Sequence, residues 1–567
     1  MSNVFSRAIS AITGQTTPPY GHPSKEGNGT PIGNGPDAGN GFLEGNGQVE
    51  MMATGYGNHG ASRTKNTMIG WITEGGSAED DIDLHGKTLR IRSRDLDAGG
   101  GLPRAAASTE TTTVIGVGLK PKPVIDYEAL NMDEAKAREW ERAARREFLF
   151  WAESKFSDAA EKKNFFQLQA LAFRSFYVSG DVFAMLPTYA SIGTPYKTHI
   201  RLLEADRIAT PDSYGESESK ATESGTGRII DGVEIDATGR VRAYHVASRH
   251  PLSAEQTESV TYERIEARGK ITGMPNILHV YVPERPEQMR GIPTNAPIIE
   301  QAKQLDRYIN SELSANVIAA MFTLFITESK EGGSYGNGLE DAVNESESVT
   351  DDNTKLQLKS GAVYQLEPGQ KPEAINPMRP NSAFKDFIDA MFTQVGASIE
   401  MPKEVMLKAF TRSYSASRAA LLEYWRKIPM ARQNFVYDFC QPIYEAVITE
   451  AVALGRLPAP GFFDDPMTRK AWLGCNWIGS TMGQLDPLKE INAAEKRIKL
   501  NISTEEREAS EFNGSDWSEN IRQRRREVEE AKALFGTDIT QAADETIVIE
   551  KEEPEDAINN DGDEDEE

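Results

Sequence analysis

The sequence predicts a mixed α+β protein built from several packed regions. With 567 residues the chain is longer than one hydrophobic core usually supports. Its first half combines amphipathic helical segments with short β-rich segments, and its second half is dominated by long helical patterns. The helical segments of the first half are 133–156 and 164–176, and the β-rich segments, each bounded by Gly, Pro or Asp, are 182–186, 199–203, 241–246 and 277–282.

A long helix is predicted to begin after Pro297. Apolar residues recur there every three or four positions, and no Gly or Pro interrupts them. These positions are Ile298, Ala302, Leu305, Ile309, Leu313, Val317 and Ala320. We therefore expect a helix over 298–322 with Ile309 and Leu313 on its buried face.

A small β insert and a second helix follow. The β-prone pieces 323–327 and 362–366 flank a polar stretch. The second helix is expected to begin at Asn381 or Ser382 as N-cap and to end before Pro402. Its apolar face consists of Phe384, Phe387, Ile388, Met391, Val395 and Ile399.

The remaining helices are predicted from their boundary residues. Residues 408–418 form a basic, Ser-rich loop, and a third long helix runs from Ala419 to about Leu454 with interruptions at Pro429 and Pro442. Asp486-Pro487 is a helix start, because Asp accepts backbone hydrogen bonds and Pro costs none at the first helical position. A last helix is expected over 518–534, ending at Gly536.

Both ends of the sequence differ in composition from the rest. Residues 27–50 repeat Gly-Asn-Gly every six positions, and because the repeat lacks a regular aliphatic position we favour a flexible linker over a β-helix for it. Residues 1–66 are therefore expected to be mobile. Residues 544–567 contain thirteen acids against Lys551 alone, which predicts a disordered tail that repels DNA or aids solubility.

Composition excludes several classes of protein. The net charge of −25 argues against a protein that coats DNA by neutralising phosphates. Cys440 and Cys475 are the only cysteines, which excludes a disulfide scaffold and a cysteine zinc cluster. The sequence has neither an apolar run of about 18 residues nor a secretory signal pattern, so we expect a cytoplasmic protein without a membrane span.

Catalytic motifs are absent from the sequence. GYGNHG at 55–60 matches a dinucleotide fingerprint by letter but lacks the strand that should precede it. A phosphate-binding loop ending at Gly86-Lys87-Thr88 would need Gly where Asp81 stands. The sequence also lacks the metalloprotease and serine-hydrolase motifs. We therefore predict no catalytic residues, no cofactor and no metal site.

Seven motifs, in a fixed order over roughly 400 residues, link this sequence to a known family. They are RSRDL at 92–96, GVGL at 116–119, WERAARREFLFWAE at 140–153, SGDVFAMLP at 179–187, EADRI at 204–208, RGIP at 290–293 and DPLKEINAAE at 486–495. In these motifs the sequence resembles the lambda-type portal proteins of tailed bacteriophages. It departs from that family in its glycine repeat and in DAGGGLPRAAASTETTT at 97–113.

The resemblance implies a portal fold in a closed ring of about twelve subunits around a DNA channel. The expected fold has a mixed α+β wing, a long helical stem, a small β-containing clip and a mainly helical crown. The corresponding regions are a flexible N-terminal segment 1–66, wing 67–297, first stem helix 298–326, clip 327–380, second stem helix 381–407, tunnel loop 408–418, kinked helix and wing return 419–480, crown 481–536 and acidic tail 537–567.

The resemblance also implies partners and a site. Lys408, Arg412, Tyr414 and Arg418 become candidates for contact with DNA in the channel; the alternatives are an ordinary solvated loop for the three cations and packing against the next helix for Tyr414. The implied partners are further copies of the chain, the terminase large subunit that supplies the ATPase motor, the major capsid protein and scaffold, a head-tail adaptor, and double-stranded DNA. The expected location is the portal vertex of the virion, after assembly in the host cytoplasm.

Two alternatives from other classes remain open on sequence alone. One is a DNA-associated connector or scaffold protein that does not form the vertex ring. The other is a cytoplasmic enzyme with an unfamiliar site, which would need a cluster of polar residues.

Overall fold

The computed structural model describes residues 61, 66–68, 70–72, 75–212, 219–222, 225, 227–254, 259–321, 384–410, 413–483 and 487–535. The chain divides into two units, Met1–Gly75 and Gly76–Glu567, and all elements discussed below belong to the second. The glycine repeat, the predicted β insert and the acidic tail lie outside the described residues. So do the predicted N-caps Asn381, Ser382 and Asp486.

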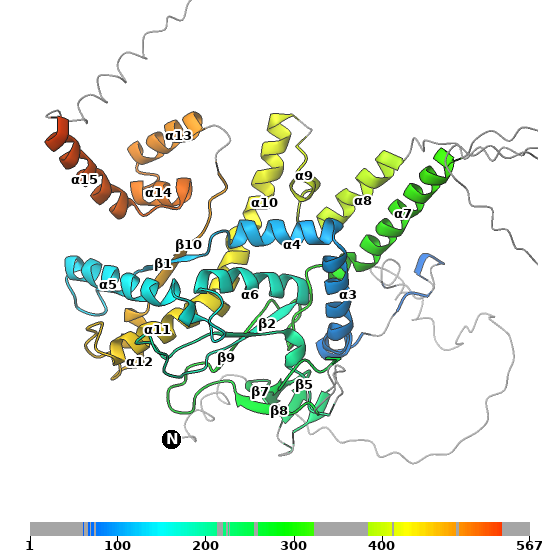
Figure 1. Ribbon diagram of the computed structural model, residues 1–567, viewed down its shortest axis with the longest axis horizontal. Helices are drawn as coiled ribbons and strands as arrows, with labels where there is room; N and C mark the ends of the chain where they lie inside the picture. The colour runs from blue at the N-terminus through cyan, green and yellow to red at the C-terminus, as the bar shows by residue number, and fades with distance from the viewer. Residues whose placement is uncertain are drawn as a thin grey trace, which may run out of the picture. The chain divides into compact units, whose positions relative to one another are not determined.

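Two helices that the sequence predicts form the centre of the main core. Helix α5 (Glu134–Ala152) follows the N-cap Asp133, and its buried residues Trp140, Ala144, Phe148 and Trp151 recur every three or four positions (Figure 1). Helix α6 (Phe165–Ser179) is apolar on most sides and largely buried. Both segments therefore form the helices expected from their periodicity.

Aromatic side chains fill the space between these helices and the C-terminal half of the chain. The Phe148 ring lies 5.5 Å from Phe165 and 5.3 Å from Tyr444, measured between centroids. Trp477 meets Phe148 edge-on at 6.1 Å. Because such offset and edge-to-face pairs add to the gain from burial, this cluster joins segments about 300 residues apart in sequence into one core.

The start of α6 is fixed by a capping box. The Asn164 side chain accepts a hydrogen bond from the Gln167 amide at 2.9 Å, and the Gln167 side chain accepts one from the Asn164 amide at 3.2 Å. Two otherwise unpaired amides are thereby satisfied.

The variant Asn164→Ala should lower the free energy of unfolding by about 1 kcal/mol, because it leaves the Gln167 amide without its acceptor. Chemical denaturation checks this value. Asn164→Ser keeps an acceptor and should lower the free energy of unfolding by only a few tenths of about 1 kcal/mol. An equal loss in both variants would contradict the capping argument.

The described residues form three antiparallel sheets beside the helices. The three-stranded sheet has the order β3-β2-β9, with β2 (Asp181–Met185) in the centre and Asp181 opposite Tyr281. The two-stranded sheet pairs β1 (Lys120–Pro123) with β10 (Cys475–Ile478). The five-stranded sheet has the order β4-β5-β6-β7-β8 and its own small core. The four predicted β-rich segments are confirmed as strands β2, β3 (Arg201–Leu203), β7 (Val241–Ala247) and β9 (Ile277–Tyr281). The other strands of the five-stranded sheet were not predicted; they are β4 (Ser219–Ala221), β5 (Gly227–Ile230), β6 (Val233–Asp236) and β8 (Tyr262–Glu266).

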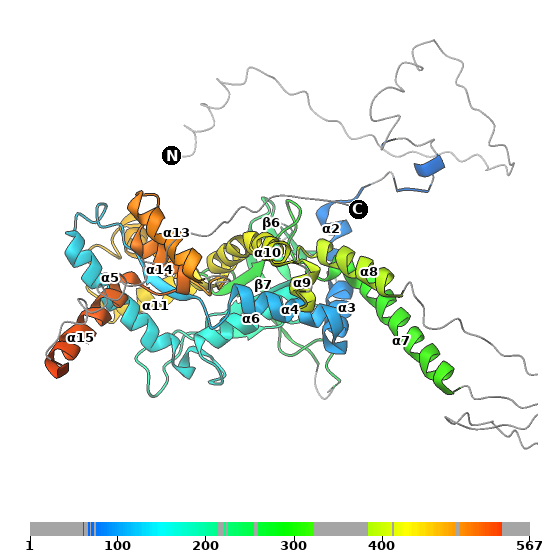
Figure 2. The same cartoon turned by 90° about the horizontal axis from the view of Figure 1, so that it is seen from above.

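Helices also form where no periodicity predicts them. Helices α2 (Ala78–Asp81) and α3 (Gly86–Gly99) precede α4 (Gly101–Val114), which lies along α6 (Figures 1 and 2). The buried residues of α3 are Gly86, Arg90 and Ser93, so its inner face is polar.

The long helices of the second half appear largely where they were expected. Helix α7 (Ile299–Met321) continues a short 3-10 turn, η7 (Ala296–Ile298), and runs beside α8 (Phe384–Ser398) in both views (Figures 1 and 2). Helix α10 (Tyr414–Phe435) continues past Pro429. A π-helical segment, η8 (Val436–Cys440), joins it to α11 (Gln441–Ala453) just before Pro442.

Shorter helices complete the described residues. Helix α9 (Lys403–Leu407) precedes α10, and α12 (Pro466–Trp472) follows α11. The C-terminal helices are α13 (Pro487–Lys499), α14 (Glu505–Asn513) and α15 (Trp517–Phe535). Helices α13 and α15 were predicted and α14 was not. None of the helices in the described ranges is long and apolar enough to cross a membrane.

Candidate functional site

The candidate DNA-contact residues lie at the turn between α9 and α10. Lys408 is exposed and caps α9 in the left-handed conformation, with φ of 53°. Arg412 lies outside the described residues. Ser413 caps α10 by accepting a hydrogen bond from the Ala416 amide at 3.4 Å, so the helix begins at Tyr414. It begins five residues earlier than Ala419, the start expected from the sequence, and the turn is correspondingly shorter.

Arg418 therefore belongs to the first turns of α10 and not to a loop. Its Nη2 lies 3.8 Å from a carboxylate oxygen of Glu490 on α13, and both side chains are partly exposed. A pair with this exposure contributes little to stability, but the carboxylate partly offsets the positive charge of Arg418. Lys408 differs from Arg418 in this respect. Its side chain is exposed, and it forms no ion pair with a carboxylate of the described residues. The contact of these residues with DNA remains a prediction.

The long helix α7 carries an apolar stripe that the described residues cover only at one end. Near the start of the helix, Ala302 and Leu305 are buried. Further along, Ile309, Leu313 and Val317 are 38%, 61% and 46% exposed. The described part of one subunit therefore does not bury Ile309 and Leu313, and the expectation that this face is buried in the stem remains a prediction for the assembled ring.

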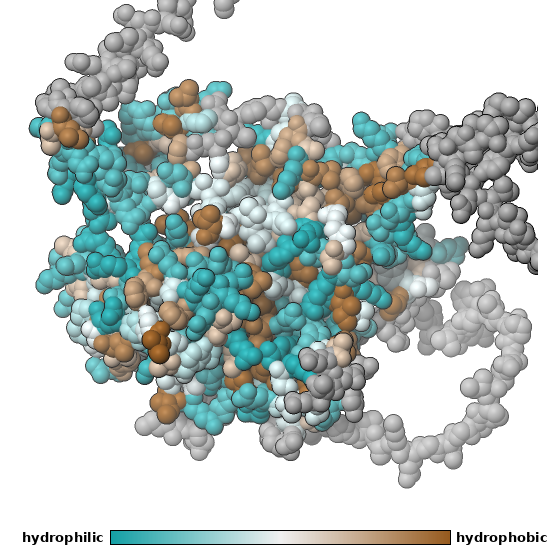
Figure 3. All heavy atoms as spheres, viewed as in Figure 1, coloured by the Kyte–Doolittle hydropathy of each residue, from teal (hydrophilic) through white to brown (hydrophobic). Residues whose placement is uncertain are grey.

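Helix α8 runs beside α7 without covering this stripe. Tyr308 contacts the rings of Phe384 and Phe387 at 5.7 and 5.0 Å, which joins the two helices, yet Phe387 is still 47% exposed. Figure 3 shows hydrophobic residues on the surface along these helices. Contiguous exposed apolar surface of this kind marks an interaction site in a soluble protein.

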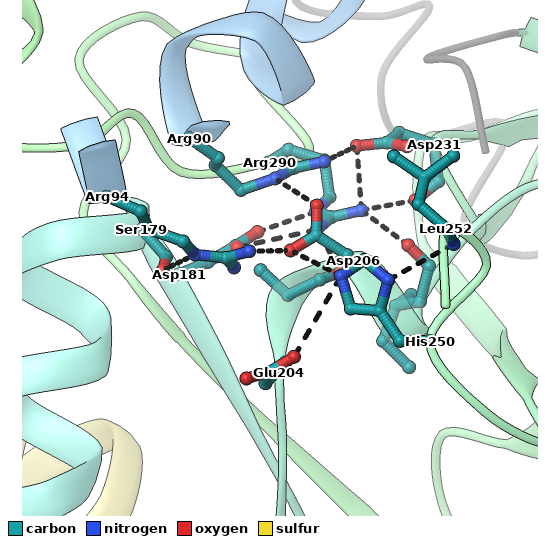
Figure 4. A network of polar contacts seen from close by, with 12 residues as sticks. Arg90, Arg94, Ser179, Asp181, Glu204, Asp206, Asp231, His250, Leu252 and Arg290 are labelled. Carbon is teal, nitrogen blue, oxygen red and sulfur yellow. Dashed lines mark hydrogen bonds and ion pairs between the residues drawn. The ribbon is translucent and has the colours of Figure 1, made fainter. Parts of the chain in front are cut away.

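A second cluster, of charged residues, is buried where α3 meets the sheets (Figure 4). Its centre is Arg290, whose side chain is fully buried. The guanidinium contacts a carboxylate oxygen of Asp181 at 2.6 Å and one of Asp231 at 2.8 Å. It also donates hydrogen bonds to the carbonyls of Ala205 (2.9 Å) and Ile208 (3.0 Å). Such multiple bonds use the fork of donors that Arg has and Lys lacks.

Two arginines of α3 complete this charge network. Arg90 is 1% exposed and lies 3.0 Å from Asp231 and 3.6 Å from Asp206. Arg94 pairs with the other oxygen of Asp206 and donates to the Ser179 hydroxyl at 3.1 Å. Three guanidiniums thus meet three carboxylates, so the charges of the network balance.

The network holds the Asp181 carboxylate in the ionised form. Burial raises the pKa of Asp181, but Arg290 and a hydrogen bond from His279 outweigh burial and hold that pKa well below its usual range. Burial lowers the pKa of His279 despite the nearby carboxylate, so His279 is neutral at pH 7. For Arg290, the carboxylates outweigh burial and raise its pKa, so the guanidinium remains charged.

A further buried carboxylate ties the segment before Gly291 to the N-terminal helices. Asp83 accepts hydrogen bonds from the amides of Met289 (3.2 Å) and Arg290 (3.1 Å). Burial raises the pKa of Asp83, and this effect outweighs the lowering by the two hydrogen bonds, so that the pKa is about 6.

The backbone packs closely at Gly180, whose φ is 90° and where a Cβ would lie 2.6 Å from the Gly291 carbonyl oxygen. Glycine is therefore required at that position.

The motifs found in the sequence meet in this network. Arg94 comes from RSRDL, Asp181 from SGDVFAMLP, Asp206 from EADRI and Arg290 from RGIP. The sequence analysis did not anticipate that they meet. The available signal was a charged residue placed between apolar or glycine neighbours, as in Gly180-Asp181-Val182. Since each charge is paired and all but Arg94 are buried, the network fixes α3 against the sheets.

No metal centre is apparent in the part of the chain that the structure describes. Its His, Cys, Asp and Glu residues form no group of three or more that could hold an ion. Cys440 is buried and Cys475 is partly buried, and both are free thiols. Burial raises the pKa of each, which disfavours the reactive thiolate.

Comparison with known families gives one extended match. The model of the family described as "Phage portal protein, lambda family" matches residues 64–432. That range contains the charge network, both stem candidates and the turn between α9 and α10.

Curated relatives agree with this match over most of their length. The portal protein of Escherichia phage N15 is 24% identical over 487 residues, which cover 82% of this chain and 88% of the relative. Portal protein B of Escherichia phage lambda is 24% identical over 464 residues, which cover 78% and 83%. Among solved structures, a chain from "Virion of native gene transfer agent (GTA) particle" aligns at 12% identity over 68% of this chain and 93% of its own length, with a TM-score of 0.30.

Proposed function

Because this chain belongs to the lambda family of phage portal proteins, a family of structural and not catalytic proteins, we propose that its copies form a closed ring around a channel for double-stranded DNA. The ring comprises about twelve copies, in the closed symmetry that most homo-oligomers adopt. It occupies one vertex of the capsid, where DNA enters during packaging and leaves during ejection. Membership in this family also favours the portal over the connector and enzyme alternatives.

The observation that carries the ring proposal is the uncovered stripe of α7. Ala302 and Leu305 continue directly into Ile309, Leu313 and Val317, so the same helical face passes from a buried to an exposed environment. If this face met only water, polar residues at these positions would not lower the stability of the subunit. The apolar residues found there therefore favour a contact with another surface. In a ring, the helices of neighbouring copies lie side by side and can cover the stripe.

The regions of the chain take roles within this ring. We assign α7 and α8 to the stem, the α+β region before them to the wing, and α13, α14 and α15 to the crown. The segment 327–380 is the clip, and the turn between α9 and α10 faces the channel. The clip and the tail lie outside the described residues, so their roles rest on the resemblance alone.

The partners follow from the portal function. Because the family is not catalytic, energy for packaging comes from the terminase large subunit, an ATPase that docks on the ring. The major capsid protein and scaffold surround the ring, and a head-tail adaptor replaces the terminase after packaging. Assembly takes place in the host cytoplasm.

Negative-stain imaging of the purified full-length protein tests the proposal. A ring with a central hole supports it. Particles that remain single chains at the highest soluble concentration would contradict it and favour a connector or scaffold that does not form the vertex ring.

The triple variant Lys408→Ala/Arg412→Ala/Arg418→Ala should leave rings intact but reduce the length of DNA packaged or retained. A channel that lets DNA slide needs few, weak contacts, and the net charge of −25 leaves only a local basic belt for them. The defect should diminish as salt rises, because salt screens these charges. Gel analysis of DNA from assembled particles at several salt concentrations measures it.

A matched control removes three exposed cations from the five-stranded sheet and its turns, in Lys220→Ala/Arg240→Ala/Lys270→Ala. This variant has the same change in net charge and should package normally. If the belt variant also packages and retains full-length DNA at low salt, its cations are ordinary solvated groups.

A further inference from the structure

A basic groove lies between α5 and α15. It is lined on the α5 side by Arg142, Arg145 and Arg146 and on the α15 side by Arg522 and Arg526, and the carboxylates of Glu153 and Glu519 also line it, so cations outnumber anions by five to two. Its apolar floor includes Leu149 and Phe150, and Phe150 is 54% exposed. Five guanidiniums at one groove contrast with the net charge of −25 of the chain.

Four of these guanidiniums have no ion-pair partner among the described residues. Arg145 pairs with Glu519, whereas Arg142, Arg146, Arg522 and Arg526 form no ion pair there. The Nε of Arg522 donates a hydrogen bond to the Ser518 carbonyl at 2.9 Å. A group of uncompensated cations beside an exposed aromatic ring suits a ligand that is both acidic and partly apolar.

The chain contains a segment of that chemistry just beyond α15. Residues 544–567 hold thirteen acids against one Lys, and the run Ile-Val-Ile at 547–549 lies among them. The charge and the apolar run match the arginines and the floor of the groove, respectively. Duplex DNA matches the arginines but offers nothing to Leu149 and Phe150 in a groove between two helices.

The connecting residues are long enough for this contact. Helix α15 ends at Phe535, and Arg526 lies nine residues earlier, roughly 14 Å back along the helix. The eight residues 536–543 can span up to about 27 Å when extended. The acidic segment can therefore return to the groove of its own subunit, and in an assembly it can also reach that of a neighbour.

We propose that the acidic segment 544–567 binds in the basic groove between α5 and α15. There its carboxylates cover the arginines of the groove and so keep nucleic acid away from them. The inference stands on the groove and the tail, and does not depend on the DNA channel proposed above.

Photo-crosslinking in the full-length protein tests the proposal. Phe150 is replaced by p-benzoylphenylalanine, and peptides crosslinked to it are identified by mass spectrometry. We expect crosslinks to residues 544–567 of the same or a neighbouring copy. Their yield should fall roughly fivefold in Arg146→Glu/Arg526→Glu, because two attractions become repulsions at a partly exposed site.

A control variant reverses one charge on each of the same two helices outside the groove lining. Lys136→Glu/Arg524→Glu changes the net charge equally and should leave the yield unchanged. Neutralising the tail, in Asp561→Asn/Asp563→Asn/Glu564→Gln/Asp565→Asn/Glu566→Gln/Glu567→Gln, should lower the yield as the groove variant does.

Binding of a labelled DNA duplex, measured by fluorescence anisotropy, separates the other occupants. If the tail fills the groove, neutralising the tail should increase DNA binding and Arg146→Glu/Arg526→Glu should abolish that increase. Absence of crosslinks to 544–567 overturns the proposal. In that case, DNA binding that depends on the groove but is unchanged by neutralising the tail would identify a nucleic-acid surface. If DNA does not bind at all, α5 and α15 are two solvated helices.

Discussion

Replacing Arg290 by Met should lower the free energy of unfolding of the region around the three-stranded sheet by about 3–5 kcal/mol. The variant leaves Asp181 and Asp231 buried with fewer cations to offset them. It also leaves the Ile208 carbonyl without the Arg290 donor, whereas the Ala205 carbonyl keeps only its bond from the Ile208 amide. An unpaired buried charge costs more than the net gain from the original pair, so the effect comes mostly from what remains behind.

Hydrogen exchange is the appropriate measurement, because a chain of several packed regions need not unfold in one step. Amides of β2 and β9 should exchange faster in Arg290→Met than in the parent protein. The control is Arg264→Met, which removes an arginine that pairs with Glu234 but is 45% exposed. An exposed pair contributes at most about 1 kcal/mol, so this variant should change exchange little.

A double variant distinguishes charge imbalance from lost packing. In Arg290→Met/Asp181→Leu, one cation and one anion are removed together, so the loss should be smaller than the sum of the two single losses. Strict additivity, or an Arg290→Met variant as stable as Arg264→Met, would show that the network is not a balanced buried unit.

Helices with an apolar face could be predicted from the sequence alone. Trp140, Ala144, Phe148 and Trp151 step along α5 at helical spacing, and that spacing predicts their burial directly. Helix α3 could not be predicted in this way. Its inner face is Gly86, Arg90 and Ser93, so its burial depends on charge partners and not on apolar periodicity.

The charge network could not be predicted because its members are distant in sequence. Arg90 and Asp231 are 141 positions apart, and Asp181 and Arg290 are 109 apart. Each motif is too short to indicate its partner. Only the antiparallel pairing of β2 with β9 and the placement of α3 bring them together. Sequence periodicity thus identifies elements, whereas their polar contacts depend on topology.

Periodicity also cannot distinguish burial within a chain from burial between chains. The stripe on α7 continues unchanged from Leu305 through Ile309 to Leu313, although Leu305 is buried in the subunit and Leu313 is 61% exposed. Burial of this face was expected from its spacing, and the described part of one subunit does not provide it. If the stripe is an interface, the cost of a polar substitution will appear in assembly and not in the folding of one subunit.

Leu313→Asp should therefore abolish or strongly weaken ring formation while leaving the isolated subunit folded. Within one subunit Leu313 meets mostly solvent, and substitutions at such positions usually change stability by no more than about 0.5 kcal/mol. In a ring, every copy of the variant would place a carboxylate in an apolar contact without a partner, and each such burial costs several kcal/mol. Closed symmetry repeats that cost at every interface. Mass photometry and negative-stain imaging measure assembly, and circular dichroism with hydrogen exchange measures the fold of the subunit.

Ser311→Asp provides the matched control, because Ser311 is exposed and two positions from Leu313, on another side of α7. It introduces the same charge into the same helix and should assemble normally. Rings from Leu313→Asp equal to those from Ser311→Asp would mean that no neighbouring copy covers the stripe. An unfolded Leu313→Asp subunit would instead mean that the stripe is buried within the chain. Burial between copies would be seen as a loss of assembly, and burial within the chain as a loss of subunit fold. This pair of variants therefore tests where the apolar face of α7 is buried.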